Sequence, residues 1–240
     1  MIKAALSRLG GLTIMALLVG CAAGPEPIVV YEDQRTSVWI QYDPKAGLGH
    51  NHPVALSPSQ IAKVLTGIRV IGRDVSGLAF FKSKEGSSAF PPSQVVLLSP
   101  YISRAFTKAS PQDMVTFYLV TNDGGAIHAT SGGLFYRKGH LYVILANAHT
   151  SPSSVQYENT YEPNQRDQPL LPIARYKFEV SFDSKDAWIP NSQAKKQDQY
   201  DADYVDESKL LVIDLSRLPA DPAISLPPAL PPAGAPASRP

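Results

Sequence analysis

Two histidines, His50 and His52, are the side chains of this sequence whose type and spacing best suit metal chemistry. Residues two apart on an extended segment project to the same side of the chain, so the two imidazoles can share a Cu²⁺ or Zn²⁺ ion. A useful site needs three or four ligands, and neither an HExxH motif nor a pair of cysteines supplies the others. We therefore expect no resident metal and keep His50 and His52 as weak candidates, in a loop that tolerates the loss of both side chains.

Ser131 lies three residues after His128, which raises the hypothesis of a serine nucleophile with a nearby base. The sequence has no GxSxG motif and no strand–turn–helix pattern around this serine. The glycines that follow, Gly132 and Gly133, are typical of a bulge or a tight bend between strands. We therefore expect no catalytic residue at this place.

The first 21 residues have the organisation of an export signal. Lys3 and Arg8 make the start positive, and residues 9–19 form an uncharged apolar run. At about eleven residues, this run is too short to span a hydrocarbon core of ~30 Å. The run is followed at once by Gly20 and by Cys21, the only cysteine of the chain.

The segment Leu18-Val19-Gly20-Cys21 resembles the lipobox of bacterial lipoproteins. The resemblance implies that residues 1–20 are a signal peptide and that a dedicated peptidase cuts before Cys21. It also implies that Cys21 carries diacylglycerol on its thiol and a further acyl chain, such as palmitate, on its new amino group. Two lipid signals already give stable anchoring, so three acyl chains would hold the protein on a membrane permanently. The resemblance covers this segment alone, and no family is identified for the folded domain.

The residues after Cys21 bear on the compartment. In the lipoprotein family, an aspartate directly after the cysteine commonly keeps the protein at the inner membrane. Ala22, Ala23 and Gly24 stand here instead, so the resemblance implies a lipoprotein of the cell outer membrane that faces the periplasm. With Cys21 used by lipid, no cysteine is left for a disulfide, and the fold depends on its core.

Charge and composition narrow the function further. Once residues 1–20 are removed, 20 of the 22 basic residues remain against 21 acidic ones, and this balance excludes the positive surface of a nucleic-acid-binding protein. Residues 21–27 are a short lipidated tether, and residues 28–218 are long enough for a single domain with its own core. Residues 219–240 include eight prolines and are expected to form a disordered Pro/Ala-rich tail.

Strand patterns dominate the predicted domain. Six segments are rich in β-branched, aromatic or apolar residues and predict strands: residues 37–42, 114–120, 126–130, 134–136, 141–145 and 210–213. Four of them are expected to form two hairpins, 114–120 with 126–130 and 134–136 with 141–145. The clearest strand is Ile173 to Asp183, in which hydrophobic and polar residues alternate. Such alternation is typical of an antiparallel sheet with one side on the core and the other in water.

Two helices are expected between the strands. Ser57-Pro58-Ser59-Gln60 has an N-cap serine, a proline at the first helical position and a glutamine at the third, which predicts a helix that ends near Gly67. Ser99-Pro100 predicts the start of a second helix. The polar segment 191–208 predicts a long loop. The fold class is therefore predicted as α+β, a mainly antiparallel β-sheet with two short helices packed on one face.

These observations favour a lipid-anchored cell-envelope protein that binds or scaffolds a partner in the periplasm and is not an enzyme. The expected partners are the membrane, through the anchor, and an envelope protein of unknown identity, with no nucleic acid. No cofactor is expected apart from the covalent lipid on Cys21. Two alternatives stay open: a periplasmic metal-binding lipoprotein that uses His50 and His52, and an envelope hydrolase with an unrecognised site.

Overall fold

The computed structural model describes residues 25–72, 86–123, 125–151, 164–173, 177–198 and 206–219. The expected signal peptide, Cys21 and the tail from residue 220 onward lie outside this part of the chain. Within it, the predicted α+β class is confirmed, since helices are combined with two antiparallel sheets of seven and three strands.

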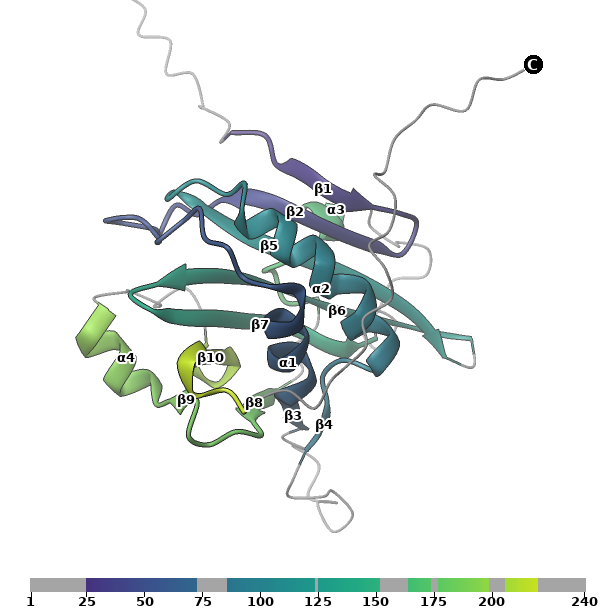
Figure 1. Ribbon diagram of the computed structural model, residues 1–240. Coiled ribbons are helices and arrows are strands. Elements are labelled where there is room, and N and C mark those ends of the chain that lie inside the picture. Colours follow the sequence, from purple (N-terminus) through teal and green to yellow (C-terminus); the bar gives the residue numbers. More distant parts are fainter. Residues whose placement is uncertain are drawn as a thin grey trace, which may run out of the picture.

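The larger sheet has the strand order β1-β2-β5-β6-β7-β10-β9. Its strands, in chain order, are β1 (Ile28–Glu32), β2 (Thr36–Tyr42), β5 (Asp113–Asp123), β6 (Ala126–Arg137), β7 (His140–Thr150), β9 (Trp188–Ile189) and β10 (Leu210–Asp214). Figure 1 shows β1 at one edge of this sheet. The turns between β5, β6 and β7 confirm both predicted hairpins.

Strand β6 runs continuously through the serine and glycines that separate two of the predicted strand segments. Its pairing with β7 shifts on both sides of Ser131, so these residues form a bulge inside one strand. A side chain at Gly132 would collide with the carbonyl oxygen of Ile144, and one at Gly133 would collide with the sulfur of Met114. The two glycines therefore allow the neighbouring chains to lie close to β6.

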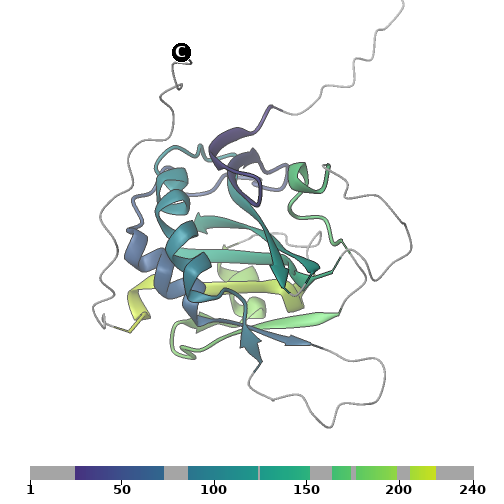
Figure 2. The same ribbon diagram turned by 90° about the vertical axis from the view of Figure 1, so that its right-hand side faces the viewer.

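Helices α1 (Pro58–Gly67) and α2 (Pro92–Phe106) pack together over one face of the larger sheet (Figure 1, Figure 2). Helix α1 begins as predicted, because Ser57 Oγ accepts the Gln60 N–H at 3.1 Å and Gln60 Oε1 accepts the Ser57 N–H at 2.9 Å. The core between helices and sheet is built from apolar side chains of both layers, including Val38, Ile61, Leu65, Leu98, Ile102 and Phe117.

The predicted start of the second helix at Ser99-Pro100 is wrong. Helix α2 begins about two turns earlier, at Pro92, and Pro100 lies inside it. Ser99 Oγ donates a hydrogen bond to Val95 O at 2.6 Å, one turn back in the helix, and so caps no helix start. Burial of Val95 and Leu98 against the core holds the helix together in spite of the internal proline.

The smaller sheet has the order β4-β3-β8 and lies on the side of the molecule away from β1 (Figure 1, Figure 2). Its strands are β3 (Ile68–Gly72), β4 (Ser87–Ser88) and β8 (Phe178–Phe182). Strand β8 falls within the predicted strand Ile173–Asp183, of which residues 174–176 lie outside the described part. Within β8 the side chains alternate between buried and half-buried, which confirms the predicted two-sided pattern.

Residues 191–208 do not form the continuous loop that their polarity predicted. Helix α4 (Asn191–Asp198) occupies the first part, and a 3₁₀ turn, η3 (Glu207–Lys209), the last. Asn191 Nδ2 donates to Glu207 O at 2.8 Å and to Leu210 O at 3.1 Å, which ties the start of α4 to β10. Ala194 is buried against the sheet, and this single small contact left little hydrophobic signal in the sequence.

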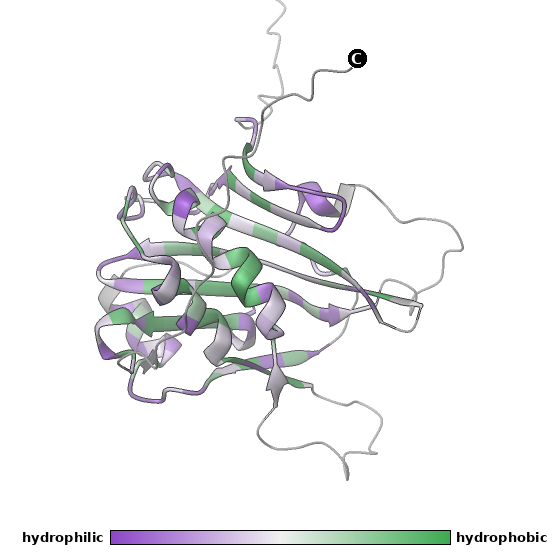
Figure 3. Ribbon diagram, turned by 45° about the vertical axis from the view of Figure 1, so that its right-hand side comes forward, coloured by the Kyte–Doolittle hydropathy of each residue, from purple (hydrophilic) through white to green (hydrophobic). Residues whose placement is uncertain are grey.

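A second layer covers the face of the larger sheet opposite α1 and α2. It contains α4 and the segment 164–171, which begins with the short helix α3 (Asn164–Asp167). Its apolar contacts involve Met114, Phe135, Tyr142, Ile144, Val212 and Leu170. Figure 3 shows hydrophobic stretches along the strands, with hydrophilic residues in turns, on the helices and at some strand positions. Burial on both faces explains why β7 is apolar along almost its whole length.

We predict that the Phe178→Ala substitution lowers the free energy of unfolding by about 3–5 kcal/mol, because the phenyl ring is buried in the core beneath β8. The neighbouring Lys177 is exposed, so Lys177→Ala should change it by less than about 0.5 kcal/mol. Urea denaturation of both variants measures the difference. Equal effects at the two positions would contradict the alternating burial.

Candidate functional site

The loop between β2 and α1 carries both candidate metal ligands, and its backbone is bonded to the larger sheet. The N–H of His50 donates to Pro111 O at 2.7 Å, and the N–H of Asn51 donates to Tyr136 O at 2.8 Å. His50 and His52 are only 4% and 5% exposed. Both imidazoles belong to the packed interior, so the expectation that the loop tolerates their loss must be revised.

His50 forms a buried pair with Asp43. Its Nε2 lies 2.8 Å from Asp43 Oδ2, and the two side chains are 0% and 2% exposed. Asp43 Oδ1 also accepts the N–H of Lys45 at 2.8 Å, and the imidazole stacks on Phe135 with 4.3 Å between ring centroids. A general base must reach its substrate, and a pair enclosed in this way holds the loop in shape instead.

His52 is bonded from a different strand. The backbone N–H of Tyr136 donates to His52 Nε2 at 2.9 Å, which makes Nε2 an acceptor and assigns the proton of the neutral ring to Nδ1. The ring of Phe106 meets the imidazole edge-on, with 5.2 Å between centroids. Burial, together with the neighbouring His50, lowers the pKa of His52 to about 4. His52 is therefore neutral at pH 7.

These contacts give the two histidines a structural task. The Nε2 atoms already bind a carboxylate, that of Asp43, and a backbone amide, that of Tyr136. A metal ion would have to break both hydrogen bonds to use these two nitrogens. In the part of the chain that the structure describes, no group of three or more His, Cys, Asp or Glu side chains is placed to hold a metal ion.

Ser131, the candidate nucleophile, is also completely buried. Its Oγ donates to Pro169 O at 2.6 Å and accepts a hydrogen bond from Asn147 Nδ2 at 2.8 Å. The same Nδ2 donates to Leu171 O at 2.8 Å, and Asn147 Oδ1 accepts the N–H of Ile173 at 2.8 Å. Ser131 and Asn147 thus bind the segment 169–173 to the sheet much as a neighbouring strand would.

His128 does not act as the base for Ser131 in this arrangement. Its Nδ1 lies 3.3 Å from the carbonyl oxygen of His149, whose own Nε2 lies 3.3 Å from Ser88 O. The Ser131 hydroxyl donates its proton to a backbone carbonyl instead. His128 and Ser131 are only three residues apart in the sequence, but they do not form a nucleophile–base pair in the structure.

Sequence reasoning missed two buried polar residues, Asn147 and Arg137. Arg137 is 4% exposed, and its Nη1 donates to Ala46 O at 2.9 Å in the β2–α1 loop. Neither residue belongs to a recognisable motif, because their partners are 16 to 91 positions away along the chain. The one available signal was an asparagine inside the apolar run of β7, a position that normally requires a hydrogen-bond partner.

The edge strand β1 is fixed by contacts at its turn into β2. Asp33 Oδ1 accepts the N–H groups of Arg35 and Thr36, each at 2.7 Å. The hydroxyl of Tyr31 donates to Asp33 Oδ2 at 2.6 Å, and this hydrogen bond raises the pKa of Tyr31 to about 12. The Tyr31 ring stacks on Tyr101 of α2 at 4.0 Å between centroids, so the turn is attached to the helical layer.

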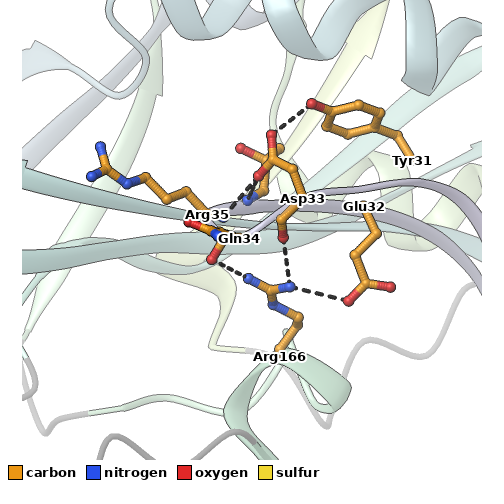
Figure 4. Close-up of polar contacts among 7 residues, drawn as sticks. Tyr31, Glu32, Asp33, Gln34, Arg35 and Arg166 are labelled. Atoms are coloured by element: carbon orange, nitrogen blue, oxygen red, sulfur yellow. Dashed lines mark hydrogen bonds and ion pairs between the residues drawn. The ribbon is translucent and has the colours of Figure 1, made fainter. Parts of the chain in front are cut away.

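Arg166 attaches the same turn to the opposite layer. Figure 4 shows its guanidinium directed at the turn from the side away from Tyr31. Nη1 donates to Glu32 Oε1 at 3.0 Å and to Asp33 O at 2.8 Å, and Nη2 donates to Gln34 O at 2.7 Å. The planar fork of an arginine suits several acceptors at once. Side chains on both faces of the sheet therefore hold this edge in place.

Two cavities on the described surface have the size of small-ligand sites. One, of about 320 Å³, is lined by Pro25, Pro27, Gln41, Tyr42, Asp167, Gln168, Pro169, Leu170 and Leu171. The other, which we call the α1–β8 cleft, has about 360 Å³ and mainly apolar walls, lined by Lys63, Thr66, Gly67, Phe182, Asp183, Ser184, Leu218 and Pro219. Lys63 Nζ donates to Pro219 O at 3.1 Å at its margin.

The chain matches no protein-family model, no curated protein sequence and no solved structure. Among the residues that the structure describes, no helix combines the length and the apolar character needed to cross a bilayer.

We predict that the free energy of unfolding falls as the pH is lowered from 7 towards 4. The unfolded chain protonates His52 near pH 6.5, whereas the folded chain does so only near pH 4. His52 therefore contributes its full stabilisation above pH 6.5. This contribution is lost between pH 6.5 and pH 4, and the total loss is on the order of 3 kcal/mol.

Urea titrations at pH 7 and pH 5 measure this loss. His52→Gln keeps an acceptor for the Tyr136 N–H and should remove much of the pH dependence. The same substitution at the half-buried His140 is the matched control and should leave the dependence in place. A His52→Gln variant with the full original pH dependence would show that another group is responsible.

Proposed function

We propose that this protein is a lipid-anchored component of the cell envelope that binds or scaffolds a partner protein without catalysing a reaction. It is held on the outer membrane by Cys21 and faces the periplasm. The lipobox resemblance of Leu18-Val19-Gly20-Cys21 supports the anchor. The described domain begins at Pro25, four residues after Cys21, so the folded body would stay close to the lipid.

The observation that carries the binding role is the α1–β8 cleft. Its apolar walls and its volume of about 360 Å³ suit a hydrophobic segment of another chain. Its lining residues come mainly from α1 and the end of β8. These elements lie on the side of the domain away from β1, which follows the tether (Figure 1, Figure 2). A partner in the periplasm would therefore meet the cleft without obstruction from the membrane.

The contacts of the candidate residues favour this role over a metal site at His50 and His52 and over a hydrolase that uses Ser131. A metal-binding function through the Nε2 atoms of His50 and His52 would require the loss of the hydrogen bonds to Asp43 and to the Tyr136 N–H. A hydrolase that used Ser131 would require the segment 169–173 to leave the sheet, because Pro169 O accepts the serine proton. The side chains of His50 and Ser131 both stabilise the fold through these contacts.

We predict that Cys21 carries the lipid. The N-terminal peptide of the protein purified from cell membranes should begin at Cys21 and show the added mass of diacylglycerol and an acyl chain. Cys21→Ser should release the protein from the membrane or stall its processing, because hydroxyl oxygen does not replace the thiol in this modification. A membrane-free wild-type protein with an unmodified thiol would end the lipoprotein hypothesis.

We also predict that the partner binds at the α1–β8 cleft. A photo-crosslinking residue in place of Thr66, which is exposed in the cleft wall, should give a discrete adduct in intact cells. The matched control is Ser93, an exposed position of α2 that does not line the cleft. The same adduct from both positions, or none from Thr66, would contradict binding at the cleft.

A further inference from the structure

One end of the larger sheet carries most of the exposed large hydrophobic side chains. In the described part of the chain seven such side chains are exposed, and five of them belong to this end: Ile28, Val29, Tyr42, Leu48 and Leu171. Their exposed fractions range from 46% to 89%. The other two, Val96 on α2 and Ile127 beside the β5–β6 turn, are less exposed, at 38% and 40%. We call the group of five the anchor-end surface.

The pairing of the strands brings these residues to the same end. Ile28 pairs with Ile40, and Tyr42 pairs with Asp113, so β1 begins where β2 ends and β5 begins. The loop that holds Leu48 is bonded to the chain just before β5, through Pro111 O. Leu171 shares the walls of the 320 Å³ cavity with Tyr42 and with Pro25, the first described residue.

The length of the tether places this end near the membrane. Four residue steps separate Cys21 from Pro25, and a fully extended chain covers at most ~14 Å over that distance. The headgroup layer of a leaflet is itself ~5–7 Å thick. Strand β5 has 11 residues and is therefore ~36 Å long. The tether thus holds one end of the sheet close to the lipid, while the end with Ile127 can lie far from it.

We infer that the anchor-end surface rests on the lipid bilayer, with its apolar side chains among the headgroups. This inference depends on the proposed anchor at Cys21. A tyrosine such as Tyr42 suits this depth, because its ring is apolar and its hydroxyl stays hydrated. The exposed charges nearby, Glu26, Lys45 and Asp167, have both signs. The contact is therefore apolar in origin and needs no anionic lipid.

The test uses the chain from Cys21 onward, which keeps every residue of the described core. Since Cys21 is the only cysteine, its thiol can be coupled to a maleimide lipid in vesicles of neutral phosphatidylcholine. Leu171→Trp and Tyr42→Trp place a fluorophore on the anchor-end surface, and Ile127→Trp is the matched control at the far end. In vesicles with brominated acyl chains, the first two variants should lose fluorescence and shift to shorter wavelength, while Ile127→Trp keeps its emission.

Chemical coupling separates this inference from the proposed function, because the contact is measured whether or not cells acylate Cys21. Native Trp39 and Trp188 contribute the same background to all three variants. Equal quenching at both ends, or none at Leu171 and Tyr42, would overturn the inference. The inference would also be overturned if the uncoupled chain sedimented as a dimer in which Leu171 and Tyr42 are shielded from solvent. A second copy of the chain would then cover this surface.

Discussion

The fold depends on the absence of side chains at Gly132 and Gly133 in the central strand β6. Larger residues would meet the backbone of β7 on one side and Met114 on the other. Because β6 links the two halves of the larger sheet, its bulge also determines where Ser131 points. The serine turns towards Asn147, and the two together bind an irregular segment of chain to the sheet.

Buried polar side chains take the place of strand pairing where irregular segments of chain lie against the sheet. Asn147 serves the segment 169–173, and the pair His50–Asp43 together with His52 serves the β2–α1 loop. Irregular chain in an interior needs partners for its N–H and C=O groups, since each unpaired group costs about 1–3 kcal/mol. The same residue types that suggest catalysis or metal binding in a sequence are the ones that meet this need.

The sequence predicted the structure correctly where the structure is determined by residues that are close together in the chain. The reciprocal hydrogen bonds of Ser57 and Gln60 and the alternation within β8 depend on neighbours in the chain. Helix α2 was misplaced because its N-cap, Pro91, offers no side-chain hydrogen bond, whereas Ser99-Pro100 imitates a start. The roles of Asn147 and Arg137 depend on residues tens of positions away, and no periodicity or motif contains that information.

The opposite placement of the edge strand β1 and the α1–β8 cleft has a mechanical consequence. Tyr31 on one face and Arg166 on the other hold the turn after β1 in place, so the sheet behaves as a rigid spacer. With the membrane anchor that we propose, the rigid body of the domain, and not the slack of a linker, would then set the distance between the cleft and the bilayer. A partner attached to another layer of the envelope would be met only if its own reach matched that standoff distance.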